Sequence, residues 1–238
     1  MELKQALREL ESKGKMTARK AYVRHGVTGS CFGVSIGDLE GMARNIKVDH
    51  DLAMGLWGSG NHDARVLATK IVDTDKLDEA MAMTWLGDAD NDVIIDAVAD
   101  VFSRMPAGAS LARRLIDSDQ EWPSTAGWTA LAKLVIAGVV DNSLAAQLLS
   151  RVERTIKDAP NRTRHAMNGL VIAIGGHRDD LRDKALATAQ IIGVVDVNHG
   201  ESGGKTPDAT GAIAKVAAGE KTKAAKALKA ANPKLKGR

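Results

Sequence analysis

The spacing of apolar residues constrains this chain most, because it follows the turn of an α-helix along much of its length. In four segments apolar side chains recur at positions i, i+3, i+4 and i+7, which places an apolar stripe on one helix face. These segments are Leu39–Ile46, Ala64–Ile71, Ile94–Val101 and Ala145–Val152. No comparable stretch alternates apolar and polar residues, and only Ile191–Val197 is compatible with a strand. The pattern predicts an all-α protein.

Short breaks separate the helical segments. Each break contains a glycine suited to a helix C-terminus, a proline, or an Asp, Asn or Ser suited to an N-cap. They lie at 58–61, 87–90, 105–108, 119–123, 158–161 and 175–176. Many short helices with irregular pair spacing and no repeated motif predict a degenerate HEAT-like helical-repeat solenoid, curved and built from stacked antiparallel helix pairs. Such a solenoid leaves a concave surface free for a long ligand.

The stretch HGESGGKTPD, which begins at His199, invites comparison with a phosphate-binding P-loop. A P-loop has four residues between its first glycine and the Gly-Lys pair, so that backbone N–H groups surround the phosphates. Only three residues separate Gly200 from Gly204. Thr206, Pro207 and Asp208 instead have the order of an N-cap and a first helical turn. We interpret the stretch as a structured loop before a helix.

Composition is that of an ordinary globular protein, with 44% hydrophobic and 26% charged residues. No apolar run is long enough to cross a membrane, and the charged N-terminus MELKQALRELESKGK is unlike a secretory signal. Cys31 is the only cysteine, and the six histidines show no metal-ligand spacing. No nucleophile elbow accompanies the serines, so hydrolase chemistry is unsupported. We expect a cytoplasmic monomer with no metal ion or cofactor.

Charge is distributed unevenly along the chain. From Lys215 onward there are eight lysines and arginines, and Glu220 is the only acid. A basic, alanine-rich tail suits a polyanion such as nucleic acid, but a tail that only improves solubility has the same composition. We predict one helical-repeat domain over residues 1–217 and a basic tail over 218–238.

Several motifs resemble the AlkD-type DNA alkylation-repair proteins, which are HEAT-like repeat DNA glycosylases acting on alkylated purines. The resemblance lies in GVSIGDLEGMARNI and in HDLAMGLWGSGNHDARVLATKI, whose most specific part is LW-x-x-G-x-H-(D/E)-A-R from Leu56 to Arg65. The stretch from Ala166 to Ala209, which includes HGESGGKTPD, resembles the end of one branch of the family. The similarity spans roughly residues 20–217. It implies a curved helix array that cradles a DNA duplex.

The resemblance also implies where the chemistry would lie. Active members carry a W-x-x-x-D arrangement facing the concave groove, and the matching segment here is DNDVIIDAVADVF. Asp96 takes the aspartate position, where a carboxylate would stabilise the positive charge that develops as a cationic base leaves, or would orient the attacking water. Asp92 takes the tryptophan position, so the aromatic face for the base is missing. Asp96 is therefore the candidate catalytic residue, and the alternative is a solvent-facing carboxylate between two apolar stripes.

Two further family positions differ. Thr125 stands where the family has an arginine that meets the DNA backbone, and Gly169 lies near the place of a second groove tryptophan. Among the aromatic residues, Trp57 and Trp128 lie on apolar stripes and are predicted to be core. Trp122 is beside a loop and is the aromatic residue predicted to reach the groove.

Basic and loop residues supply the candidate DNA contacts. Arg162 and Arg164 open a helix after Pro160, which suits a phosphate clamp, although a solvated first turn has the same sequence. The loop residues His199 and Lys205 offer donors to an anion. Arg151 and Arg154 are predicted to add to the same basic surface, and the alternative for them is a solvated face. The predicted nucleic-acid-binding set is Arg151, Arg154, Arg162, Arg164, His199, Lys205 and Trp122.

Three functions stay open on the sequence. The preferred hypothesis is a DNA-binding protein that holds duplex DNA, damaged or branched, in a concave, positively charged groove with a degenerate catalytic site. The first alternative is an active glycosylase that excises alkylated purines of the 3-methyladenine or 7-methylguanine type with Asp96. The second alternative is a non-enzymatic scaffold that binds a protein partner.

Overall fold

A computed structural model describes residues 1–231, which form α-helices and two short 3-10 helices and contain no strand. The first helices are α1 (Leu3–Lys13), α2 (Met16–Arg24), α3 (Ile36–Ile46), α4 (His50–Gly58), α5 (His62–Ile71), α6 (Glu79–Gly87) and α7 (Asp92–Arg104). The later ones are α8 (Gly108–Leu115), α9 (Glu121–Ile136), α10 (Asn142–Thr155), α11 (Asn161–His177), η1 (Asp179–Leu181), α12 (Arg182–Ile192), η2 (Gly200–Ser202) and α13 (Ala209–Ala231). The all-α prediction is confirmed. Lys234, Lys236 and Arg238 of the predicted tail lie outside the described residues.

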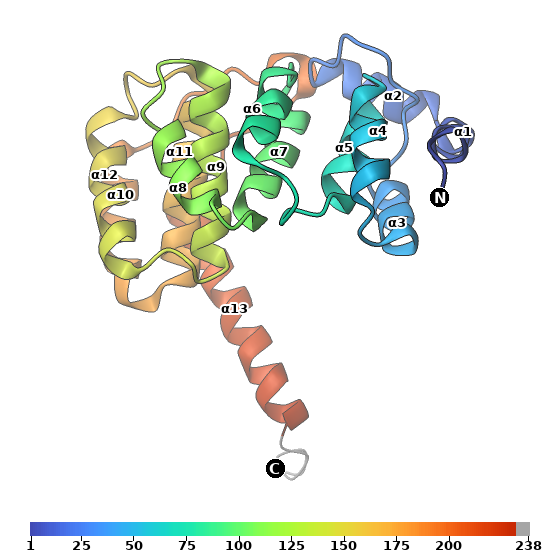
Figure 1. Cartoon of the computed structure of the whole chain (residues 1–238). Helices are drawn as coiled ribbons and strands as arrows, with labels where there is room; N and C mark the ends of the chain where they lie inside the picture. The colour runs from blue at the N-terminus through green and yellow to red at the C-terminus, as the bar shows by residue number, and fades with distance from the viewer. Residues whose placement is uncertain (232–238) are drawn as a thin grey trace.

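The helices form a curved array of two layers, called the inner and the outer layer below (Figure 1). Helices α5, α7, α9, α11 and α13 pack side by side in that order and make the inner layer. Helices α4, α6, α8 and α12 pack on their partners in the inner layer, and α10 packs on α12. The stacked helix pairs predicted from the apolar spacing are therefore present, and the beginnings of α7, α9 and α11 meet at one end of the inner layer.

Side-chain caps explain where many of the helices begin. The Asn61 side chain accepts a hydrogen bond from the backbone N–H of Ala64 at 3.2 Å, and Asn91 accepts one from Ile94 at 3.1 Å. Similar caps start other helices, at Ser35, Asp49, Asp78 and Asp141. Each cap contributes about 1 kcal/mol by satisfying a backbone donor that the helix itself leaves open.

Two local expectations are corrected. The helix predicted to start at Thr206 has Asp208 as its N-cap, because Asp208 Oδ2 accepts a hydrogen bond from the Gly211 N–H at 2.7 Å. The stretch Ile191–Val197 is not a strand: α12 continues to Ile192 and stops at Gly193, whose φ of 63° ends the helix. The β-branched run after this glycine forms a loop because no neighbouring strand is available to pair with it.

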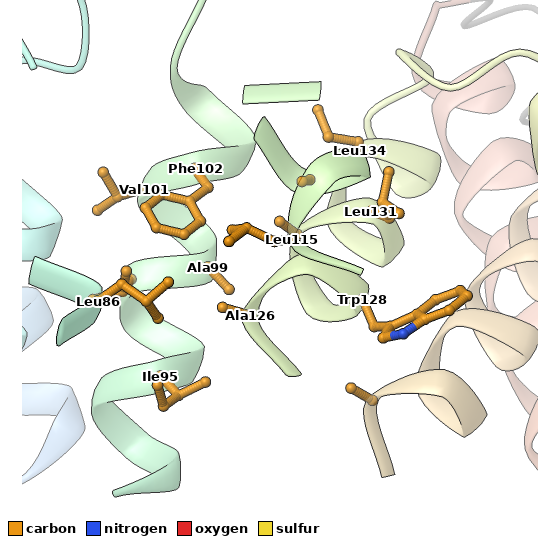
Figure 2. Packing of buried hydrophobic residues seen from close by; sticks show 14 of the residues in the cluster. Leu86, Ile95, Ala99, Val101, Phe102, Leu115, Ala126, Trp128, Leu131 and Leu134 are labelled. Atoms are coloured by element: carbon orange, nitrogen blue, oxygen red, sulfur yellow. The ribbon is translucent and has the colours of Figure 1, made fainter. Parts of the chain in front are cut away.

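The core runs continuously between the layers. Trp57 and Trp85 stack with ring centroids 4.2 Å apart. Trp128 is only 2% exposed and belongs to the same cluster of buried residues as Leu131, and its ring points away from α7 (Figure 2). Trp57 and Trp128 are thus core residues, as the apolar stripes predicted. Burial of an aromatic side chain stabilises the fold by a few kcal/mol, so these rings hold the layers together.

Helix α13 is attached to the array through its first turns. A Cβ at Gly175 would lie 2.8 Å from Ile213, and one at Gly176 would lie 2.4 Å from Val216, so the two glycines let α13 approach α11 closely. Beyond these turns α13 extends away from the array (Figure 1). The helix continues without a break through the predicted boundary at residue 217.

A buried carboxylate fixes the position of α2. Asp63 is 0% exposed and accepts hydrogen bonds from the backbone N–H groups of three consecutive residues, Phe32, Gly33 and Val34, at 2.6, 3.1 and 2.8 Å. The Tyr22 hydroxyl of α2 donates to the Val34 carbonyl at 2.6 Å. The loop that Asp63 organises therefore anchors α2, which contributes few other side chains to the core.

No helix within residues 1–231 combines the length and apolarity that a membrane span needs.

Candidate nucleic-acid interface

A cavity of about 330 Å³ lies where α7, α9 and α11 begin. Asp92, Trp122 and Arg162 come from the first turns of these three helices and line it. The end of α2 and the loop before and within η2 form the opposite wall, and these two segments also contact each other. Three helix N-termini direct their partial positive charges toward this end of the array. The remaining lining residues are Val23, Arg24, His25, Gly26, Asp90, Asn91, Asn198, His199, Gly200 and Glu201.

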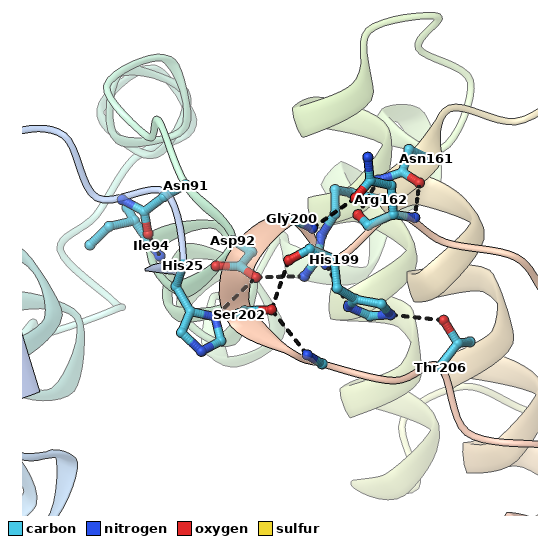
Figure 3. Close-up of polar contacts among 12 residues, drawn as sticks. His25, Asn91, Asp92, Ile94, Asn161, Arg162, His199, Gly200, Ser202 and Thr206 are labelled. Atoms are coloured by element: carbon cyan, nitrogen blue, oxygen red, sulfur yellow. Dashed lines mark hydrogen bonds and ion pairs between the residues drawn. The ribbon is translucent and has the colours of Figure 1, made fainter. Parts of the chain in front are cut away.

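Two of the residues that line the cavity, Asp92 and Arg162, form an ion pair (Figure 3). Arg162 Nη2 lies 2.8 Å from Asp92 Oδ2, and the two side chains are 17% and 22% exposed. His25 Nδ1 lies 3.6 Å from the same carboxylate oxygen. The backbone N–H of Arg162 donates to Glu121 Oε1 at 2.6 Å. Because Arg162 and Asp92 are 70 residues apart, the pair joins α11 to α7 across α9.

The loop HGESGGKTPD contributes a histidine to this network. His199 Nδ1 is 3.3 Å from Arg162 Nη1, and its Nε2 is 3.0 Å from the Thr206 hydroxyl. The His165 ring meets the His199 ring edge-on at 5.3 Å. Burial, and then the nearby Arg162 guanidinium, lower the pKa of His165 below its ordinary value. His165 is therefore neutral at neutral pH. The loop, through Asn198 to Glu201, forms part of the cavity wall.

Asp96 lies one helical turn beyond Asp92 on α7. Its side chain is open to water, yet surrounding protein displaces much of the bulk solvent, and this desolvation raises the pKa of Asp96. Lys133 and Arg162 oppose the shift, whereas Asp92 adds to it. A carboxyl group that is both water-accessible and surrounded by protein is typical of a concave surface, where Asp96 was predicted to lie.

The inner layer carries charges of both signs instead of a uniformly positive surface. Asp92, Asp96 and Asp100 follow one another at four-residue intervals along α7. Asp92 is paired with Arg162, and Asp100 lies 3.1 Å from Lys133. The acids on α7 are thus largely neutralised by cations of α9 and α11, and little free positive charge remains on this wall.

Helix α2, whose end lines the cavity, carries exposed positive charge. Arg19, Lys20 and Arg24 are exposed, and the helix contains no acidic residue. Arg24 also lines the cavity. This surface was not predicted from the sequence, although the run from Lys15 to Arg24 contains four basic residues and no acid.

The structure brings together three of the predicted contact residues and separates the others. Trp122, Arg162 and His199 share the cavity. Arg164 lies on another side of α11, beside Lys157 and the loop after α12. Lys205 is exposed in the glycine loop.

The two remaining predicted contacts lie on α10, in the outer layer. Arg151 binds Asp117 at 2.6 Å and stacks over the Trp128 ring at 5.6 Å. Arg154 is exposed on the same helix. Arg151 therefore has a packing role that its sequence context did not reveal, and a DNA contact by α10 stays a prediction.

The two family positions that differ also have structural explanations. Thr125 is buried, and its hydroxyl is 3.3 Å from that of Thr163, so this hydroxyl pair joins α9 to α11. A Cβ at Gly169 would meet no atom within 4 Å, so a larger side chain would fit there. Within residues 1–231, no three His, Cys, Asp or Glu side chains are arranged to hold a metal ion.

Comparison with known proteins agrees with this architecture. The family model described as "DNA alkylation repair enzyme" matches residues 3–207. The uncharacterized protein Lin0241 of Listeria innocua is 30% identical over 221 residues, which cover 87% of this chain and 93% of the relative. The uncharacterized protein Lmo0209 of Listeria monocytogenes matches with the same identity and coverage.

A solved structure extends the comparison to the fold. It is described as "A new family of proteins related to the HEAT-like repeat DNA glycosylases with affinity for branched DNA structures". The two chains are 29% identical with a TM-score of 0.83, and the match covers 90% of this chain and 93% of the other. The HEAT-like solenoid expected from the sequence is thereby confirmed.

Proposed function

This chain belongs to the DNA alkylation repair enzyme family, and on that premise we propose that it binds DNA, preferring branched forms, and does not excise bases. The observation that carries the proposal is the Asp92–Arg162 ion pair. It fills the place where, by the family resemblance, an aromatic face would meet the cationic base. On this proposal the protein holds DNA through exposed cations, and the ion pair takes the place of part of the excision site.

Two features support DNA as the ligand. Arg19, Lys20 and Arg24 of α2 are exposed and are not balanced by an acid within that helix, and Arg24 also lines the cavity. Contacts between such side chains and phosphates provide most of the sequence-independent affinity for DNA. The similar solved structure comes from a family with affinity for branched DNA.

The ion pair supports the second part of the proposal, that the protein does not excise bases. A leaving cationic purine needs an aromatic or anionic surface that is free to receive it. Asp92 Oδ2 is already engaged by Arg162 at 2.8 Å, and the guanidinium adds positive charge near Asp96. The arrangement would repel a cation more than the family's tryptophan does.

A binding and a cleavage assay test the proposal together. Fluorescence anisotropy with a four-way junction and a linear duplex of the same sequence should give tighter binding to the junction, and affinity for both should fall steeply between about 50 and 200 mM salt. Methylated duplex DNA incubated with the protein should release no free base. Failure to bind either DNA at low salt would contradict the proposal and favour a protein-binding scaffold.

A glycosylase remains the alternative, and the position of Asp96 favours it. This carboxylate is accessible to water on α7, one helical turn from the cavity residue Asp92, and the alternative requires that it meets the sugar of a bound nucleotide. The alternative is upheld if the wild-type protein releases 7-methylguanine or 3-methyladenine and Asp96→Asn abolishes the release. Asp100→Asn, on the same helix, is the control.

A further inference from the structure

The cavity at the start of α7, α9 and α11 has a composition that differs from a simple phosphate site. We propose that it binds a single unpaired nucleobase, stacked on Trp122, at the branch point of a DNA ligand. The inference rests on the proposed function, because it names the group of the DNA that this site takes. It also gives a physical reason for a preference for branched DNA.

Trp122 is the first observation. Trp57, Trp85 and Trp128 are between 2% and 4% exposed and serve the core. Trp122 is only partly buried, lies in the first turn of α9 and lines the cavity. An aromatic ring at the wall of a polar cavity provides a stacking surface that any base can use, because each base has a π-face.

The polar groups around the cavity are the second observation. Arg162, His25 and His199 offer donors, and three carboxylates, Asp90, Asp92 and Glu201, offer acceptors. A phosphate presents only acceptors, so the carboxylates would repel it. A nucleobase presents donors and acceptors on one edge and carries no net charge. The mixed lining therefore fits a base better than a phosphate.

Access is the third observation. The cavity lies between the starts of α7, α9 and α11 and a wall formed by the end of α2 and the loop at η2, which contact each other, and the exposed Arg24 is part of this wall. A base held in a duplex is stacked and paired and is not able to enter such a space. The first unpaired base at the branch of a splayed duplex has no partner, so little unpairing energy opposes its entry. The cations of α2 would hold the neighbouring phosphates outside.

A fluorescent base tests this directly. The full chain is titrated into a splayed duplex that carries 2-aminopurine either at the unpaired branch position or within a paired arm, and anisotropy of an end label reports total binding. We expect quenching at the unpaired position only. Trp122→Ala should abolish the quenching and weaken binding of the splayed duplex about tenfold, while Trp122→Phe should restore most of both. A thermal melt of each variant shows whether the fold is kept.

The outcomes separate the nucleobase site from DNA binding itself. If anisotropy shows binding but the signals at both label positions are alike, or if Trp122→Ala keeps the quenching, the nucleobase inference is overturned and the proposed function stands. If inorganic phosphate displaces the quenched base at constant ionic strength, the cavity is a phosphate site instead. If no variant and no wild-type protein binds DNA, both the inference and the proposed function fail.

Discussion

At the scale of single residues, the buried carboxylate of Asp63 holds a loop in place. Asp63 accepts three backbone hydrogen bonds from one loop and thereby fixes the segment on which Tyr22 and α2 depend. Hydrogen bonds to a charged group are among the stronger ones, and a buried acceptor has no water to replace its partners. Asp63, the acidic residue of the H-(D/E)-A-R motif, therefore has a structural role.

Replacing Asp63 should be costly. In Asp63→Asn one acceptor oxygen becomes an amide donor that faces backbone N–H groups, so we expect the free energy of unfolding to fall by roughly 2–4 kcal/mol. Urea denaturation followed by circular dichroism measures the loss. Asp51→Asn is the matched control, because Asp51 is exposed on α4. Equal stability of the two variants would contradict the structural role of Asp63.

His62, beside Asp63, makes stability depend on pH. It is 4% exposed and packs on Tyr22 with ring centroids 4.7 Å apart. Burial lowers the pKa of His62 below its ordinary value of 6.5, and the nearby carboxylates Asp63 and Asp90 offset this only in part. The unfolded chain therefore takes up the proton first as the pH falls, so protonation favours unfolding.

The stabilising contribution of neutral His62 is present above about pH 6.5 and is lost below it. We expect the free energy of unfolding to fall between about pH 7.5 and pH 5.5, and we expect a smaller fall in His62→Gln. His177→Gln, a half-buried histidine on α11, controls for the substitution. Urea titrations at each pH provide the measurement, and an unchanged pH slope in His62→Gln would show that other groups are responsible.

At the scale of helices, α2 and α10 are the two candidate surfaces for phosphate. On α2, the side chains of Arg19, Lys20 and Arg24 are exposed, and Arg24 lines the cavity. On α10, Arg151 is held by Asp117 and Trp128, which leaves Arg154 exposed in the outer layer. The structure thus favours α2 as the surface that meets the DNA backbone.

A charge-matched pair of triple variants distinguishes the two surfaces. Arg19→Ala, Lys20→Ala and Arg24→Ala together should weaken DNA binding at least tenfold and reduce the slope of log K against log salt by about two to three, because each lost phosphate contact removes about 0.9 of slope. The control combines Arg113→Ala, Arg154→Ala and Lys157→Ala, three exposed residues of the outer side. Should the control lose more affinity, α10 is the contact surface.

Helix α13 contributes differently along its length. Its first turns pack on α11 through Ile213, whereas residues after 217 extend from the array. A chain ending at residue 217 should keep its melting temperature within a few degrees and bind DNA with a reduced salt slope. Differential scanning fluorimetry and anisotropy check the two expectations. A large drop in melting temperature would show instead that the helix beyond 217 belongs to the folded domain.

At the scale of the whole molecule, the sequence predicted the architecture better than the site. Apolar spacing and cap residues are local, so the helices and their stacking could be predicted from the sequence, whereas a DNA contact by Trp122, which lines the cavity, stays a prediction. The Asp92–Arg162 pair could not be predicted, because its two members are 70 residues apart in sequence and meet only when α7, α9 and α11 pack together. For the same reason the expected positive wall is neutralised in the structure by contacts between helices. The start of α13 was misplaced because Thr206 and Asp208 both suit an N-cap, and the hydrogen bond to His199 decides between them.

The contact between α2 and η2 joins the beginning of the array to its end. Open repeat arrays unfold piecewise, since each unit depends only on its neighbours. Here the loop that contains η2, near the end of the array, packs on α2 at its beginning, so we expect the loss of one of these segments to destabilise the other. Tryptophan fluorescence and circular dichroism should therefore report a single coincident denaturation curve, and fraying from either terminus should be suppressed. Two separated transitions would mean that this contact does not hold in solution.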